Sequence, residues 1–443
     1  MRHAGWLLAR RFFARPQAPG RRPAGRLASR WTQWTGRVTG GMMAALAAAA
    51  PATYQDWDQP PHSYFERTPT DRFTRLKDRL ESGELALDRG NEKAFLLGLL
   101  DVLGIPASSQ MLVFSTTSLQ LGLISPANPR ALYFNEDLYV GFIPGGRIEV
   151  VSLDPDLGAV FYILDRPREG QPLRAERSTR CMNCHAGEET GFVPGLTIKS
   201  VLPGVSGGSL DSFRRNQSGH AIPLAERFGG WHVTGVPGFT NHWGNRLGES
   251  EGGTVTVRSL RPGERFDWGR YPVATSDLLP QLLHEHQAGL VNRAVGLTYR
   301  ARAWREAEGP AWPAKHAAEL EQQARELVRY LLFADEAPLP PGGVGGSEAY
   351  REDFRRGRRE VEGESLKDFD LATRLFRHRC SYMIYSPVFR GLPAEARTRV
   401  LGILGEALDD RADGTEGRHL PRAEKQRIRR ILRATLPDLP PGW

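Results

Sequence analysis

One short segment of the chain carries residues that can attach and ligate a cofactor. Cys181, Met182, Asn183, Cys184 and His185 form the pattern C-x-x-C-H, the attachment signature of a c-type haem. The two thiols can add to the two vinyl groups of one porphyrin, and the adjacent histidine then lies beneath the iron as its proximal ligand. With 3 Cys and 11 His in 443 residues, the pattern arises by chance in only about 5 in 10,000 such chains. We therefore expect one covalent haem c per chain, held by Cys181, Cys184 and His185.

Other uses of two cysteines at this spacing fit the sequence less well. A zinc site needs two further ligands at short spacing, whereas the only other cysteine is the distant Cys380. A thioredoxin-like dithiol belongs at a strand-to-helix junction of a βαβ unit, but here a polar loop precedes the motif. A structural disulfide between residues so close in sequence would close almost no loop entropy. Cys380 itself is expected to be a small buried hydrophobic residue.

The sixth ligand of the iron decides what the haem can do. Met raises the potential, His lowers it, and an open position permits peroxide or small-gas chemistry. We expect a histidine from the loops that follow the motif, with His220 ahead of His242, because loops near a cofactor can wrap it. Pro223 stiffens the chain just after His220, which suits a loop that presents one side chain. A methionine ligand and an open site remain alternatives.

The remaining candidate ligands have simpler interpretations. His286 falls on the apolar face of a predicted helix and is expected to be a core histidine. His232 alternates with apolar residues on a predicted strand and is expected to face solvent. Met383 lies among aromatic and aliphatic neighbours, where methionine is usually core filler. The other candidates are His62, His284, His316, His378 and Met111.

The elements that must position the motif are α-helical at both ends of the chain and β-rich in the middle. Helices are predicted over residues 70–82, capped by Thr70 or Asp71, and over 93–103. Short β-rich runs separated by turn residues then indicate an antiparallel meander. These runs cover residues 132–134, 138–143, 147–153 and 159–164.

The motif itself lies in a loop-rich haem segment, residues 166–264, with brief strand signals at 231–234 and 254–257. A helical part of about residues 276–443 follows, with helices expected after Ser276, over 320–331 and from 371 to about 436. The charged run 351–364 is expected to be a solvated loop. We therefore predict an α+β fold, with a meander between flanking helices, rather than a small all-α class I cytochrome c.

The basic charge of the chain is confined to its beginning. Residues 1–52 hold nine arginines and no acidic residue, and without them the net charge of +8 becomes −1. This basic stretch runs into the alanine-rich segment 44–50, in the order typical of an export signal. We expect cleavage near Thr53, a single α+β haem-binding domain over 53–443, and a periplasmic location. The nearly neutral body argues against nucleic-acid binding, and any membrane association is expected to be peripheral or through the leader.

Several stretches of the sequence are also similar to one protein family. They are SSQMLVFS (108–115), RALYFN (130–135), the haem motif, GGWHVTG (229–235) and CSYMIYS (380–386). They resemble a large family of exported bacterial proteins known only as cytochrome c domain-containing. The resemblance implies one covalent haem and no established reaction. In that family the residue after the histidine matched by His242 is often Met; Trp243 stands there in this chain, which removes a thioether ligand from this loop.

Three classes of function are compatible with one covalent haem. Electron transfer to and from a partner redox protein is the leading hypothesis. A haem oxidoreductase, peroxidase-like and with an open distal site, is the alternative, and about 390 residues around one haem favour something beyond shuttling. Exported peroxidases of this size typically carry two haem motifs, however, and this chain has one. A haem-based sensor or interaction protein that uses the long middle loops is the third hypothesis.

Overall fold

A six-stranded antiparallel sheet lies at the centre of the computed structural model. Its strands pair in chain order, and the predicted four-stranded meander forms the middle of the sheet, with one further strand at each edge. The strands are β1 (Met111–Val113), β2 (Arg130–Phe134), β3 (Leu138–Phe142), β4 (Ile148–Asp154), β5 (Gly158–Leu164) and β6 (Ala175–Arg177). The structure describes residues 56–165, 168–213, 218–235, 239–409, 415–440 and 442–443. The expected leader, residues 1–52, lies outside them.

The turns of the meander follow from their residues. Asn135 Oδ1 accepts from the backbone N–H groups of Asp137 and Leu138, which closes the turn between β2 and β3. Asp154 Oδ1 closes the turn before β5 in the same way. Gly158 ends that turn with φ +79, a conformation that favours glycine.

Helices cover both faces of the sheet. On one face, α1 (Arg72–Glu81) packs Phe73 against Tyr162, with ring centroids 4.8 Å apart, and Asp71 caps the helix through the Thr74 N–H. The opposite face meets the long helix α4 (Leu278–Glu308), where Tyr139 donates to Gln287 Oε1 at 2.7 Å. Successive strand residues point to opposite faces, so Tyr139, Val151 and Phe161 share the α4 side. The other N-terminal helix is α2 (Glu92–Val102).

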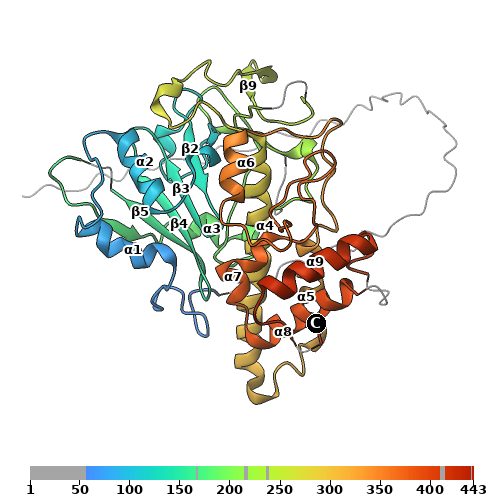
Figure 1. Ribbon diagram of the computed structural model, residues 1–443. Helices are drawn as coiled ribbons and strands as arrows, with labels where there is room; N and C mark the ends of the chain where they lie inside the picture. The colour runs from blue at the N-terminus through green and yellow to red at the C-terminus, as the bar shows by residue number, and fades with distance from the viewer. Residues whose placement is uncertain (1–55, 166–167, 214–217, 236–238, 410–414, 441) are drawn as a thin grey trace, which may run out of the picture. The chain divides into compact units, whose positions relative to one another are not determined.

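The C-terminal part is less regular than predicted. Beyond α4 come α5 (Ala317–Leu331), α6 (Glu348–Arg355), α7 (Pro387–Arg390), α8 (Ala394–Ala407) and α9 (Arg422–Thr435). Figure 1 shows α5, α8 and α9 near the lower part of α4, and α5 packs on both α4 and α8. The continuous helical segment expected from residue 371 is wrong, because 371–381 is irregular. The solvated loop expected at 351–364 is wrong in part, because α6 occupies its beginning.

The loop-rich segment that carries the C-x-x-C-H motif contains short elements between its loops. Besides the one-turn helix α3 (Met182–His185), these are two small hairpins, β7 (Val201–Pro203) with β8 (Ser209–Ser212) and β9 (Arg246–Glu251) with β10 (Thr254–Ser259). The predicted strand at 254–257 is confirmed by β10. Residues 231–234 make only isolated bridges, Trp231 to Val113 and Thr234 to Asp277.

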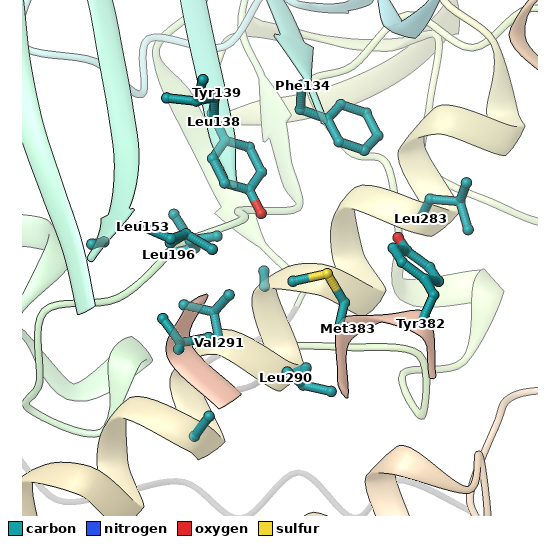
Figure 2. Packing of buried hydrophobic residues seen from close by; sticks show 14 of the residues in the cluster. Phe134, Leu138, Tyr139, Leu153, Leu196, Leu283, Leu290, Val291, Tyr382 and Met383 are labelled. Carbon is teal, nitrogen blue, oxygen red and sulfur yellow. The ribbon is translucent and has the colours of Figure 1, made fainter. Parts of the chain in front are cut away.

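One hydrophobic core joins the sheet, α4 and the C-terminal segments. Figure 2 shows Phe134, Leu138 and Tyr139 from the sheet, Leu283, Leu290 and Val291 from α4, and Tyr382 and Met383 from the turn that precedes α7. Met383 is fully buried there, as expected of core filler, and so is Cys380. Leu196 of the haem segment belongs to the same core. Burial of one such side chain stabilises the fold by about 1.5–3 kcal/mol.

Candidate haem-attachment site

The motif residues meet on one turn of helix. Cys181 is the N-cap of α3, and its carbonyl accepts from the backbone N–H groups of Cys184 and His185 at 3.2 and 3.0 Å. Residues three and four apart share a helix face, so this turn places Cys181 on the same side as Cys184, three positions on, and as His185, four positions on. Met182 is buried and anchors the turn, and the Ser178 N–H donates to the Phe161 carbonyl at 2.8 Å, which ties the motif to the sheet.

The two motif thiols differ in exposure. Cys184 is exposed, whereas Cys181 is half-buried and its thiol donates to Ser178 Oγ at 3.2 Å. Burial raises the pKa of the Cys181 thiol. Cys380 is also a free thiol, and burial raises its pKa to about 12. Cys380 is therefore an inert core residue, as the sequence predicts, and Cys184 is the more accessible of the two motif thiols.

His185 is oriented as a metal ligand. Its Nδ1 lies 3.0 Å from the Gly195 carbonyl. Because a carbonyl only accepts, Nδ1 carries the proton and Nε2 keeps its lone pair. The imidazole packs against Phe161, with ring centroids 4.4 Å apart. Burial lowers the pKa of His185 to about 4, and Arg130 adds to this effect. The neutral ring with a held Nδ1–H is the form in which histidine binds iron, so these residues fit a haem.

A partly buried ion pair lies on the sheet face beside the motif. Arg130 pairs with Glu149 across the sheet, and their side chains are 16% and 13% exposed. Both cover Gly141, where a Cβ would lie only 2.7 Å from Arg130 Nη2 and 3.0 Å from Glu149 Oε2. Glu149 also accepts from Ser118 and Gln120.

The charges of Arg130 and Glu149 act on the motif residues. Burial alone would raise the pKa of the Glu149 carboxyl, but Arg130 and the hydrogen bonds from Ser118 and Gln120 outweigh it and the pKa is lowered. Glu149 interacts electrostatically with both His185 and Cys181. Sequence reasoning missed this pair, although a charged residue between Ile148 and Val150 in an apolar strand was a signal that it needs a buried partner.

His220 lies in a buried aromatic cluster, as does His286. The Nδ1 atoms of the two imidazoles are 2.7 Å apart, and His286 Nε2 is 2.7 Å from Ser381 Oγ. The His220 ring stacks on Tyr330 at 4.0 Å between centroids, and its buried Nε2 has no hydrogen-bond partner in the described part of the chain. Burial lowers the pKa of both histidines, that of His286 to about 3. His286 is thus buried as expected. It also links His220 to Ser381 in a series of side-chain hydrogen bonds that the sequence did not predict.

His242 is buried on a different loop. Its Nε2 donates to the Phe239 carbonyl at 3.2 Å, and its ring faces Phe239 at 5.1 Å between centroids. Among the described residues, neither His220 nor His242 makes a hydrogen bond or ring contact with His185. The expected solvent exposure of His232 is wrong: its ring is fully buried against Phe114 and Phe266.

The described residues contain no group of three or more His, Cys, Asp or Glu placed to hold a metal ion. A haem does not require one, since the porphyrin supplies four nitrogens to its iron. Over the same residues, no helix combines the length and apolar character needed to cross a membrane. Comparisons with known protein families, curated proteins and solved structures found no match for this chain.

Proposed function

We propose that this chain is a periplasmic, monohaem c-type cytochrome that acts in electron transfer and belongs to the exported family it resembles. The observation that carries the proposal is the α3 turn, where Cys181, Cys184 and His185 lie together and Gly195 holds the Nδ1 of His185. In this proposal the protein takes one electron from a partner redox protein and passes it to another.

The chain's own residues have distinct tasks in this function. When bound, haem c supplies reversible one-electron chemistry at its iron. Cys181 and Cys184 would hold it through thioethers, and His185 Nε2 would ligate the iron. Phe161 excludes water from one side of the imidazole. The exposure of Cys184 supports an attachment edge near the surface, where a partner can approach.

A haem oxidoreductase with an open distal site is the second candidate. The observation that favours it is the engagement of His220 with His286 and of His242 with Phe239, away from His185. An iron with no protein ligand at its sixth position can bind peroxide or carbon monoxide. Absorption spectra of the oxidised and reduced protein, before and after addition of carbon monoxide, separate the two candidates: a spectrum unchanged by carbon monoxide supports the electron carrier.

Covalent attachment is tested with two cysteine variants. The protein, made in a host that attaches haem to exported proteins, should give a haem-stained band on a denaturing gel. Cys184→Ser should weaken or abolish the band, whereas Cys380→Ala, which alters a buried thiol outside the motif, should keep it. A colourless wild-type protein contradicts the proposal.

Export is tested on the same preparation. The haem-containing form should fractionate outside the cytoplasm, with an N-terminus near Thr53. Retention of Arg10 in the mature haem protein would show that residues 1–52 are not a cleaved signal.

A further inference from the structure

A three-residue strap, Pro194 to Leu196, holds the imidazole of His185. Gly195 exchanges two hydrogen bonds with this histidine: its N–H donates to the His185 carbonyl at 2.8 Å, and its carbonyl accepts from Nδ1 at 3.0 Å. At the start of the strap, the Pro194 carbonyl accepts from Ala159 N–H of β5 at 3.1 Å. The orientation of His185 therefore depends on where this strap lies.

Asn292 of α4 holds the other end of the strap. Its Oδ1 accepts from Leu196 N–H at 2.8 Å and its Nδ2 donates to the Leu196 carbonyl at 2.9 Å. The same Nδ2 reaches Ser218 Oγ at 3.2 Å. Asn292 is buried, and Figure 2 shows Leu196 in the core with Leu153 of the sheet and Val291 of α4. One amide thus satisfies both backbone groups of a buried residue next to Gly195.

The close approach of Asn292 explains why residue 195 is a glycine. A Cβ on residue 195 would lie 2.4 Å from Asn292 Oδ1, a distance at which one of the two must move. The strap, the amide and the imidazole therefore form one connected arrangement in which each member limits the position of the next.

We infer that Asn292 is a positioning residue for His185 and thereby tunes the redox potential of the haem; the inference rests on the proposed function. A histidine that donates Nδ1–H to a well-placed carbonyl is a more basic ligand. A more basic ligand favours Fe(III) and lowers the potential. In this inference Asn292 acts on the iron through the Gly195 carbonyl and His185.

The test compares two asparagines that make the same kind of contact. Asn245 holds Val233 as Asn292 holds Leu196, accepting from its N–H at 2.9 Å and donating to its carbonyl at 2.7 Å, but it lies outside the strap. Asn245 has φ +61, so its matched variant is Asn245→Gly, which the backbone tolerates. The midpoint potential should rise in Asn292→Ala and stay at the wild-type value in Asn245→Gly, although both variants lower the unfolding temperature.

A second pair of variants acts from the glycine side. Gly195→Ala pushes its new Cβ onto Asn292 and should also raise the potential. Gly187→Ala is the control, because a Cβ there meets its nearest atom, the Cys184 carbonyl oxygen, at an ordinary 3.7 Å. Hydrogen exchange of the Leu196 amide should accelerate about fivefold in Asn292→Ala, with or without haem, since that N–H loses its acceptor.

The outcomes separate the inference from the function on which it rests. Covalent haem with unchanged potentials in Asn292→Ala and Gly195→Ala overturns the inference and leaves the cytochrome intact. A wild-type protein without haem overturns both. An equal rise of the potential in Asn245→Gly also contradicts the inference, because general loosening would then account for the effect.

Discussion

At the scale of single residues, the Arg130–Glu149 pair places a partly buried charge of each sign beside the motif. Removal of the anion in Glu149→Gln should raise the midpoint potential, since a nearby negative charge favours Fe(III). Arg130→Gln should lower it for the opposite reason. Glu149→Gln should lose about 3–5 kcal/mol of unfolding free energy, because it leaves Arg130 without its counter-charge. Arg130→Gln should lose less, because Ser118 and Gln120 still donate to Glu149. Potentiometric titration and denaturant unfolding measure the two effects.

Arg147→Gln is the control for that pair. Arg147 precedes β4 and is exposed, so its charge is screened by solvent and the potential should hardly move. Potentials that shift in the same direction for Arg130→Gln and Glu149→Gln would contradict the electrostatic account.

The sixth ligand remains a prediction at this scale. His220 keeps an unpartnered Nε2 among the described residues, although its Nδ1 is engaged by His286. If His220 ligates the iron, His220→Ala should convert a low-spin spectrum to high-spin and open the iron to carbon monoxide. His242→Ala tests the second candidate, whose Nε2 donates to Phe239 and whose buried Nδ1 has no hydrogen-bond partner among the described residues. An unchanged spectrum in both variants moves the assignment to an open site or another ligand.

At the scale of elements, α4 connects the sheet, the strap and the C-terminal core. Leu290 is fully buried on this helix, and Leu290→Ala should cost about 2–5 kcal/mol through lost burial and a residual cavity. Leu121, which is 56% exposed, is the matched control, and Leu121→Ala should stay within about 0.5 kcal/mol of the wild type. Chemical denaturation measures both. A loss below 1 kcal/mol in Leu290→Ala would mean that this part of α4 relaxes freely.

The elements also show which parts of the fold can be predicted from the sequence. The sequence predicts the four central strands, β2 to β5, and the first two helices, because alternating or helical apolar spacing coincides there with local turn and cap residues, such as Asn135 and Asp71. The irregular segment 371–381 has no alternating or helical apolar spacing. Asp370 closes a local turn at its start, and distant residues hold the rest: Leu375 N–H donates to Glu336, and Arg379 binds Glu424. Contacts between residues that are far apart in the chain leave no periodic pattern in the sequence.

The candidate site likewise contains residues that the sequence predicts and residues that it does not. Its proposed attachment residues are contiguous, so the motif alone predicts Cys181, Cys184 and His185. Gly195, Asn292 and the Arg130–Glu149 pair were not foreseen, because each acts through a neighbour that only the folded chain supplies. The exposure of His232 was misjudged because strand alternation does not reveal that Phe114 and Phe266 cover the second side.

At the scale of the whole molecule, buried neutral histidines make stability depend on pH. Burial lowers the pKa of His232 and of His286 to about 3, below the unfolded value of 6.5. As pH falls below 6.5, the unfolded chain binds protons that the folded chain does not, so stability is lost between pH 6.5 and about 3. Each histidine should contribute about 2 kcal/mol of this loss between pH 7 and 5.

Thermal unfolding across this pH range measures the effect. His232→Phe, which removes one such group without adding a polar atom, should flatten the curve. A melting temperature that is constant from pH 7 to 5 would contradict the burial of neutral imidazoles.

The hydrogen bond from Ser178 to Phe161 also bears on whether haem attachment must precede folding of this part of the chain. It joins the chain just before the motif to β5, next to the pairing of β5 with β6, and it leaves Cys181 half-buried against Ser178. A haem-joining enzyme needs both thiols within reach, so it would have to act before this edge of the sheet closes. Maturation and folding would then compete for the same segment. Chains that close the edge first would accumulate as a folded, colourless product that cannot be matured later without reopening.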